Sequence, residues 1–272
     1  MKKNYYLLIV LLCFTQFVKG QCSPDLIAPI PDALILTNVT SECSVIALIA
    51  PTATDNCSAV VTGTHNATLP ITTQGTTVVT WTYDDGNGNT STQNQNVVID
   101  DVTNPTAPTL PVVTGECSAT ATTPSTTDNC SGSITGTTTD PLTYNTQGTH
   151  TINWSFDDGN GNVIIVSQNV VIDDITNPVI PALSDVTGAC SATATMPSTT
   201  DNCSGTISGT TTDPLTYNTQ GTHTINWSFD DGNGNVIIVS QNVVIDDVTN
   251  PVIPTLSDVT GECSATASTP ST

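Results

Sequence analysis

Residues 149–174 read THTINWSFDDGNGNVIIVSQNVVIDD, and this stretch decides the fold class. Its first half alternates large apolar residues with polar ones, at Ile152, Trp154 and Phe156. Its second half alternates in the same way and puts four aliphatic residues on one face, namely Ile164, Val166, Val170 and Ile172. The central DDGNGN contains an Asn-Gly pair, which is a strong signal for a hairpin turn. The stretch therefore predicts two long, half-buried strands joined by a β-hairpin.

This hairpin belongs to a unit that recurs with a period of 73 residues. Residues 117–189 and 190–262 are identical at 67 of 73 positions, and Trp81, Trp154 and Trp227 are spaced by the same interval. A unit of this length is longer than a solenoid repeat and can form a small domain with its own core. A near-identical array suits a spacer or an adhesive stalk, whereas an enzyme needs one site built once.

The period divides the chain into five segments. We expect a signal peptide at 1–20, a divergent first repeat at 21–101, repeat 2 at 102–174, repeat 3 at 175–247 and the opening of a fourth repeat at 248–272. Because the fourth repeat stops where its predecessors continue, we expect the chain to be part of a longer protein. An anchoring or sorting region would then follow.

The composition of the repeat predicts an all-β fold. No segment has helical periodicity, and Thr, Val, Gly and Pro are abundant, which disfavours helices. Short alternating segments between turns predict tandem immunoglobulin-like (Ig-like) β-sandwich domains, each with Trp81, Trp154 or Trp227 at the centre of its core. Three prolines confine residues 102–113 to a sheet edge. The linkers contain proline and no flexible glycine-serine tract, which predicts an elongated rod; they are residues 100–105, 173–178 and 246–251.

The N-terminus reads as a secretory signal peptide, with Lys2 and Lys3 before the apolar run Tyr5–Phe14 and a small-residue cleavage site before Gln21. That run is about ten residues, whereas a membrane-spanning helix needs about 20. Cleavage removes all three cations and leaves 24 acidic residues. Because phosphate groups are bound by Lys and Arg, nucleic acid and anionic membranes are excluded as partners. We expect a secreted, soluble product in the extracellular space or on the cell surface, with no membrane insertion.

Eight cysteines remain after cleavage, and in an exported chain this periodic set predicts disulfides. We favour pairing within each repeat, which closes loops of about 13 residues and contributes roughly 3 kcal/mol per bridge. The favoured pairs are Cys43–Cys57, Cys117–Cys130 and Cys190–Cys203, with Cys22 unassigned and Cys263 opening a fourth pair. An alternative register pairs the cysteines across the junctions as Cys22–Cys43, Cys57–Cys117, Cys130–Cys190 and Cys203–Cys263.

Three motifs together resemble a known family. The hairpin with its DDGNGN turn, the following VIDDVTNP and the upstream TTDNC are similar to hyalin-repeat (HYR) modules. The resemblance covers nearly all of residues 22–272 and is greatest to arrays in large surface adhesins of gliding and biofilm-forming Bacteroidetes. It implies an Ig-like sandwich, display on the cell surface and adhesion. The chain departs from animal HYR modules in lacking their additional cysteine pair, for which Cys22 is the one candidate.

The acidic turns and linkers are the candidate functional residues. The last strand of a repeat is about ten residues, or about 33 Å, so in an elongated domain the DDGNGN turn must lie beside the preceding linker. Carboxylate and amide oxygens suit Ca²⁺, which takes about six to eight oxygen ligands. The gathered aspartates also need neutralisation, because each close pair repels by about 1 kcal/mol even in water.

We therefore predict Ca²⁺ as a cofactor at each junction. The predicted ligands at the first junction are Asp100, Asp101, Asn104, Asp157, Asp158, Asn160 and Asn162. Those at the second junction are Asp173, Asp174, Asn177, Asp230, Asp231, Asn233 and Asn235. The alternative is that Asp, Asn and Gly occur there only because hairpin turns use them.

No catalytic constellation accompanies these residues, and we do not expect an enzyme. His150 and His223 share one repeat position and are interpreted as packing residues at a strand end, while His65 lies in a different strand. The aspartate pairs resemble a glycosidase dyad, but a dyad duplicated in every turn of an array is a weaker interpretation than a metal site.

Two functions remain open from the sequence. The first is a structural, adhesive stalk stiffened by disulfides and Ca²⁺. The second is a multivalent module in which each repeat binds a surface glycan or protein, since avidity also rewards multiplicity. The sequence does not identify the ligand in either case.

Overall fold

The computed structural model describes residues 24–57 and 59–269, where the chain consists of β-strands, turns and loops. The predicted signal peptide and Cys22 lie outside the described residues. No helix in the described part is long and apolar enough to cross a bilayer. The chain forms two compact units, and the boundary between them runs through repeat 2. The first unit runs to Leu110 and includes Thr123–Asp140 and Asn153–Ser167, and the second contains Pro111–Thr122, Pro141–Ile152 and the chain from Gln168.

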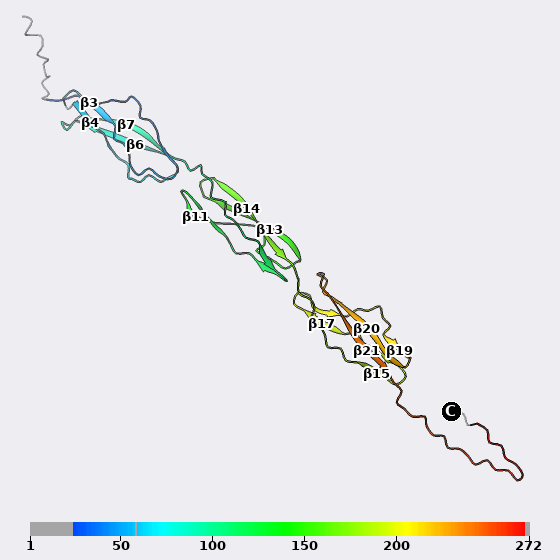
Figure 1. Cartoon of the computed structure of the whole chain (residues 1–272). Helices are drawn as coiled ribbons and strands as arrows, with labels where there is room; N and C mark the ends of the chain where they lie inside the picture. Colours follow the sequence, from blue (N-terminus) through cyan, green and yellow to red (C-terminus); the bar gives the residue numbers. More distant parts are fainter. Residues whose placement is uncertain (1–23, 58, 270–272) are drawn as a thin grey trace, which may run out of the picture. The chain divides into compact units, whose positions relative to one another are not determined.

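Repeat 1 lies in the first unit and forms a two-sheet sandwich (Figure 1). Its strands are β1 (Ile30–Pro31), β2 (Val39–Ser41), β3 (Thr52–Asp55), β4 (Ala59–Thr62), β5 (Thr64–His65), β6 (Gly75–Asp84) and β7 (Thr90–Ile99). One sheet has the strand order β2-β7-β6-β5 and the other β1-β3-β4. The core takes Ala53 and Val61 from the second sheet and Val79, Trp81 and Val97 from the first.

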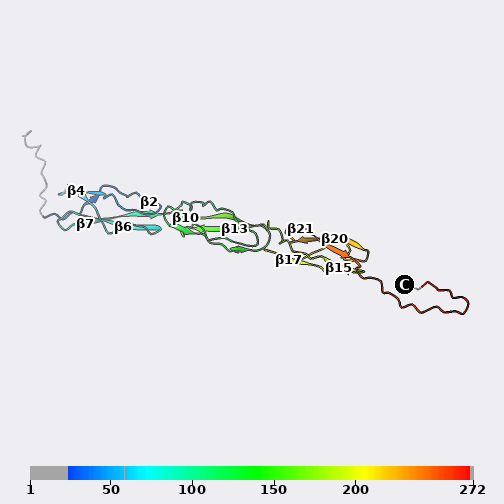
Figure 2. The same cartoon turned by 60° about the horizontal axis from the view of Figure 1, so that its bottom comes forward.

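Repeat 3 lies in the second unit, and its long strands β20 and β21 run side by side (Figure 2). Its strands are β15 (Val186–Gly188), β16 (Ala192–Thr193), β17 (Ser198–Asp201), β18 (Gly205–Ser208), β19 (Thr216–Tyr217), β20 (Gly221–Asp230) and β21 (Val236–Ile245). They form a sheet of order β15-β21-β20 and the pairs β16-β19 and β17-β18.

Repeat 2 has the same succession of elements. Its strands are β8 (Val113–Gly115), β9 (Ala119–Thr120), β10 (Ser125–Asp128), β11 (Gly132–Thr135), β12 (Thr143–Tyr144), β13 (Gly148–Asp157) and β14 (Val163–Ile172). The predicted alternation holds, since Ile152, Trp154 and Phe156 are at most 1% exposed. Trp81 and Trp227 are also 1% exposed. The prediction of an all-β chain with three repeated β-sandwich domains is confirmed.

In each main sheet, the strand that comes first in the sequence is short and lies at the edge of the sheet. In repeat 3, β15 pairs in parallel with the end of β21, where Val186 lies opposite Val243 and Gly188 opposite Ile245. β8 pairs with the end of β14 in the same way and is the last strand of its sheet. The prolines of residues 102–113 leave only Val113 in a strand, because proline cannot donate a ladder hydrogen bond.

The aromatic core allows no side chain at Gly209. A Cβ atom built there would lie 2.9 Å from Cε1 and 3.0 Å from Cζ of Phe229, and 3.3 Å from Cγ of Pro197. We expect Gly209→Ala to lower the free energy of unfolding by roughly 1–3 kcal/mol through overpacking. The neighbouring exposed variant Ser208→Ala should be near neutral, and urea unfolding followed by tryptophan fluorescence compares the two. Equal stability of the two variants would contradict the prediction.

Candidate metal centre

The turn between β13 and β14 is wrapped around one carboxylate. Asp158 Oδ1 accepts hydrogen bonds from the backbone N–H groups of Asn160 (2.7 Å) and Asn162 (3.2 Å). Asp158 Oδ2 accepts a third bond from Asn162 Nδ2 at 2.7 Å. The backbone can close in this way because Gly159 and Gly161 have φ of 82° and 112°, which glycine adopts without strain. The turn thus presents a buried acidic group, 8% exposed, at the end of the long hairpin.

The preceding linker supplies the second carboxylate. Asp101 is 4% exposed, and its Oδ2 accepts a hydrogen bond from Asn160 Nδ2 at 3.1 Å. Its carbonyl oxygen accepts a bond from Asn162 Nδ2 at 2.9 Å. Its Oδ1 accepts one from the backbone N–H of Thr103 at 3.2 Å. The two asparagines of the repeat 2 turn therefore hold the last residue of repeat 1.

The third carboxylate is that of Asp128, the last residue of β10, in the TTDNC segment. Asp128 Oδ1 accepts hydrogen bonds from the backbone N–H groups of Cys130 (2.8 Å) and Ser131 (2.9 Å). Ser131 Oγ in turn donates to the carbonyl oxygen of Asp158 at 2.6 Å, which fixes this hairpin against the acidic turn. The other oxygen, Asp128 Oδ2, is buried without a hydrogen-bond partner. One carboxylate oxygen from each of Asp101, Asp128 and Asp158 lies within 4.8 Å of the others.

No lysine or arginine of the described residues neutralises this cluster, because the three lysines of the chain are Lys2, Lys3 and Lys19 and there is no arginine. Two charges 4.8 Å apart repel by about 3 kcal/mol at an effective dielectric constant of about 20. Uncharged N–H donors reach five of the six carboxylate oxygens, and Asp128 Oδ2 is the sixth. A hard divalent cation fits this donor set, since it would add charge compensation and a partner for that oxygen.

The second junction repeats these hydrogen bonds in repeats 2 and 3, and there Asp174 and Asp201 lie with Cys203 within 4.8 Å of one another. Asn233 Nδ2 donates to Asp174 Oδ2 at 3.0 Å, and Asn235 Nδ2 donates to the Asp174 carbonyl oxygen at 2.8 Å and to Asp231 Oδ2 at 2.7 Å. Asp174, Asp201 and Asp231 are 3–8% exposed. Asp201 Oδ2 is buried without a hydrogen-bond partner, as is its counterpart Asp128 Oδ2.

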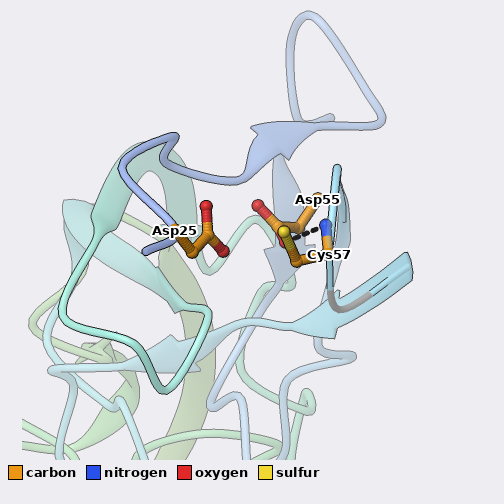
Figure 3. Close-up of side chains that lie close together, drawn as sticks. All are labelled: Asp25, Asp55 and Cys57. Carbon is orange, nitrogen blue, oxygen red and sulfur yellow. Dashed lines mark hydrogen bonds between the residues drawn. The ribbon is translucent and has the colours of Figure 1, made fainter. Parts of the chain in front are cut away.

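A third cluster lies in repeat 1. Oxygens of Asp25 and Asp55 and the sulfur of the disulfide-bonded Cys57 lie within 4.8 Å of one another (Figure 3). Asn87 Nδ2 donates to Asp25 Oδ2 at 3.2 Å, and Asn89 Nδ2 donates to the Asp25 carbonyl oxygen at 3.1 Å. Asp25 therefore makes the contacts at repeat 1 that Asp101 makes at repeat 2.

The predicted ligands divide into two groups. Those brought together are Asp101, Asp158, Asn160 and Asn162 at the first junction and Asp174, Asp231, Asn233 and Asn235 at the second. The others have exposed side chains, and they are Asp100, Asn104, Asp157, Asp173, Asn177 and Asp230. Asp157 and Asp230 end strands on the solvent side and accept bonds only within their own turns, from Gly159 and Gly232. The side-chain nitrogens of Asn160 and Asn233 face the carboxylates. Each of these two side chains would therefore have to rotate its amide group to offer its oxygen to a metal.

The prediction omitted Asp128 and Asp201, together with Asp25, Asp55 and Asp85 around repeat 1. One signal is present in the sequence, since an aspartate precedes each of Cys57, Cys130 and Cys203 by two residues. Turn chemistry alone accounts for the residue types of TTDNC, so its composition does not mark the aspartate as a ligand.

The predicted disulfide pairing is wrong in both registers. The structure joins Cys43 to Cys130 and Cys117 to Cys203, at sequence separations of 87 and 86 residues. Each bridge therefore links a cysteine at the repeat position of Cys43 and Cys117 to the cysteine of the next repeat at the position of Cys130 and Cys203. Cys57 is also disulfide-bonded, whereas Cys190 and Cys263 are exposed free thiols.

Strand length explains why the local pairing fails. In repeat 3, Cys190 follows Gly188, which lies opposite Ile245 at the end of β21. Cys203 precedes Ser204, whose Oγ binds the carbonyl oxygen of Asp231 before β21 begins. The ten residues of β21 separate these two places by about 33 Å, whereas a disulfide needs Cα atoms within about 7 Å.

The acidic turns also carry a pH dependence. Burial raises the pKa of Asp158, but hydrogen bonds from Asn160, Asn162 and Gly161 outweigh it, so the pKa lies below its ordinary value of 3.8. The pKa of Asp231 is lowered by the same set of bonds.

We expect acid to unfold the calcium-free protein through these turns. A lowered folded-state pKa contributes stability that is complete above the unfolded pKa and is lost as the pH falls through the folded value. Urea unfolding should therefore show falling stability below about pH 4, and Asp158→Asn should flatten the dependence. The exposed control Asp157→Asn should leave it steep. A profile identical in wild type and Asp158→Asn would contradict the prediction.

The histidines make packing contacts in the structure. His150 stacks on Tyr144 and His223 on Tyr217, each with ring centroids 4.4 Å apart. His65 meets Trp81 edge-on at 5.1 Å.

Comparison with known proteins gives similarity of fold alone. No family model and no curated protein matches the chain. Among solved structures, protocadherin gamma B2 extracellular cadherin domains 1–5 match at 13% identity over 82% of this chain, with a TM-score of 0.28. The human desmocollin-1 ectodomain matches at 12% identity over 83% of this chain, with a TM-score of 0.22. The chain spans 60% of the length of each. An endo-fucoidan hydrolase of glycoside hydrolase family 107 matches at 11% identity over 80% of this chain and 44% of its own, with a TM-score of 0.20.

Proposed function

We propose that this chain is part of an extracellular stalk with an adhesive or structural role, in which Ca²⁺ bound at each junction holds successive repeats together. The observation that carries the proposal is the cluster of Asp101, Asp128 and Asp158, which two successive repeats build jointly around a buried oxygen without a partner. A metal held there stabilises only the joined form, because neither repeat contains all three carboxylates.

Other observations support an exported, non-catalytic role. Inter-repeat disulfides persist in oxidising compartments, and the signal peptide expected from the sequence is consistent with export. The near-identity of repeats 2 and 3 suits a spacer. We further propose an HYR-like surface or gliding adhesin of Bacteroidetes as the family setting, on the motifs DDGNGN, TTDNC and VIDDVTNP.

The chain's own residues would perform three tasks at the junction. Asp101, Asp128 and Asp158 would hold the ion, which supplies positive charge when bound. Backbone N–H groups of Cys130 and Ser131 orient the Asp128 carboxylate. Burial of the three carboxylates to 4–9% exposure limits competition from water.

Calorimetric titration of the mature chain tests the proposal. We expect Ca²⁺ to bind with a dissociation constant in the range of about 10⁻⁴–10⁻³ M, typical of extracellular modules, and to raise the melting temperature reversibly by chelator. Mg²⁺ should bind more weakly, because it demands a smaller and more regular site. Absence of binding at millimolar Ca²⁺, with no chelator-sensitive melting shift, would refute the calcium centre.

A second candidate function rests on a groove in repeat 2. It has a volume of about 370 Å³ and is lined by Thr137, Thr138, Thr139, Asp140, Asn153, Ser155 and Ile165. Hydroxyl and carboxylate groups of this kind suit sugar hydroxyls, which favours the multivalent glycan-binding alternative. Binding of the mature chain to a glycan array would support this function. Absence of glycan binding would contradict it, and the structural stalk would remain as the proposed function.

A further inference from the structure

The two disulfides that join successive repeats close overlapping loops. Cys43–Cys130 encloses the chain between those residues, and Cys117–Cys203 encloses a second stretch that begins before the first one ends. The shared segment runs from Cys117 to Cys130 and contains β9 and β10. Neither within-repeat pairing nor a simple tandem array would produce such an overlap.

This overlap shortens the covalent path along the chain. Force applied to the two ends of the chain is transmitted from Cys43 through the first disulfide to Cys130. It then follows the backbone back to Cys117 and passes through the second disulfide to Cys203. Cys43 and Cys203 are 160 residues apart in sequence, but this path uses only the 13 peptide steps between Cys117 and Cys130. The long hairpins β6–β7 and β13–β14 lie wholly outside it.

We propose that the inter-repeat disulfides act as a tension bypass, so that force on the chain cannot draw out the sandwich domains even when they unfold. Residues 44–116 and 131–202 are shielded, and the extension of the Cys43–Cys203 interval is limited to the shared segment. At about 3.5 Å per extended residue this limit is about 45 Å, compared with about 560 Å for the open chain. The device is independent of calcium and goes beyond the proposed function of the junctions.

Single-molecule pulling tests the bypass on the full mature chain, held by tags at its two ends. Cys22, Cys57, Cys190 and Cys263 are replaced by serine, which leaves only the two inter-repeat disulfides. After force has unfolded the repeats, reductant is added under tension. The first disulfide to break should release about 60 residues, or about 210 Å, and the second about 86 residues, or about 300 Å, whichever breaks first.

This unequal pair of steps is specific to overlapping loops. Two consecutive loops, Cys43–Cys117 and Cys130–Cys203, would release about 74 and about 73 residues, or about 260 Å each in either order, and that result would overturn the proposal. An oxidised chain that extends as far as the variant lacking both disulfides would overturn it as well. Because the two disulfides form before force is applied, the step lengths require only that the four-serine variant folds once.

Limited proteolysis gives a second readout in the same four-serine background. A single cut anywhere between Cys43 and Cys203 should leave the pieces joined on a non-reducing gel and separate them on a reducing gel. In the additional variant Cys43→Ser/Cys130→Ser, cuts between residues 44 and 116 should separate without reductant, whereas cuts between 131 and 202 should not. Separation of singly cut chains that retain both disulfides would contradict the bypass.

Discussion

Asp128→Asn is expected to lower the affinity of the first junction for Ca²⁺ by roughly tenfold or more, a loss of about 1.4 kcal/mol or more. The substitution keeps the size of the side chain but removes one of three buried charges and the partnerless oxygen. Asp157→Asn is the matched control, because it makes the same charge change at an exposed residue that binds only its own turn. Calorimetric titration of the two variants measures the difference.

The effect of the same variant on the melting temperature should depend on calcium. In chelator, the wild type keeps three carboxylates within 4.8 Å of one another, and removing one charge relieves repulsion of about 3 kcal/mol per pair. Asp128→Asn should therefore melt at a higher temperature than the wild type in chelator. At a Ca²⁺ concentration a hundredfold above the wild-type dissociation constant, the wild type gains about 2.7 kcal/mol at this site and a variant of tenfold weaker affinity gains about 1.4 kcal/mol, so the advantage of the variant should shrink by about 1.3 kcal/mol.

A purely structural role for Asp128 gives a different result. If its only task were to accept hydrogen bonds from Cys130 and Ser131, the variant would be destabilised by the same amount in chelator and in calcium. Such parallel melting shifts would contradict the metal centre. Asp201→Asn provides an independent repetition at the second junction, where the corresponding oxygen is also buried without a partner.

The fold was predictable because its signals are local. Alternation at Ile152, Trp154 and Phe156 defines the buried face of β13 without any knowledge of the rest of the domain. The Asn-Gly turn sets the hairpin, and the length of the following strand places that turn beside the preceding linker. The proximity of Asp101 and Asp158 was therefore predictable from the sequence.

The rest of the site depends on contacts between segments distant in sequence. Asp128 reaches the cluster because the β10–β11 hairpin is fixed to the acidic turn by Ser131, and no sequence period reveals this contact. The disulfide pairing is non-local for the same reason, since proximity in sequence suggested partners that the long strands keep apart. Exposure of Asp100 and Asp157, beside the buried Asp101 and Asp158, follows from side chains that alternate along the chain.

The largest effect on stability is expected from the inter-repeat disulfides. In the chain-entropy description, a bridge closing a loop of 87 residues stabilises the folded state by about 4.5 kcal/mol. Cys43→Ser/Cys130→Ser should therefore lower the free energy of unfolding by about this amount, far more than the roughly 3 kcal/mol expected of a local bridge. Cys190→Ser is the matched control, since this free thiol occupies the repeat position of Cys43 and Cys117. Urea unfolding in chelator compares the variants.

Loss of that disulfide should also weaken calcium binding. Cys130 lies two residues from Asp128, and Glu42, beside Cys43, accepts hydrogen bonds from Asn129 Nδ2 at 2.9 Å and from Thr103 Oγ1 at 2.5 Å. The bridge therefore holds the turn that carries Asp128 against the linker that carries Asp101.

Calcium binding and the disulfide should stabilise each other by the same factor. If the disulfide raises the affinity for calcium by a given factor, calcium must raise the equilibrium resistance of the disulfide to reduction by that factor. We expect a factor of roughly 10, which is about 1.4 kcal/mol. Calcium titration of the double variant and thiol exchange of the wild type with and without calcium measure the two sides. A double variant that binds calcium as tightly as the wild type would show that the junction is organised without its disulfide.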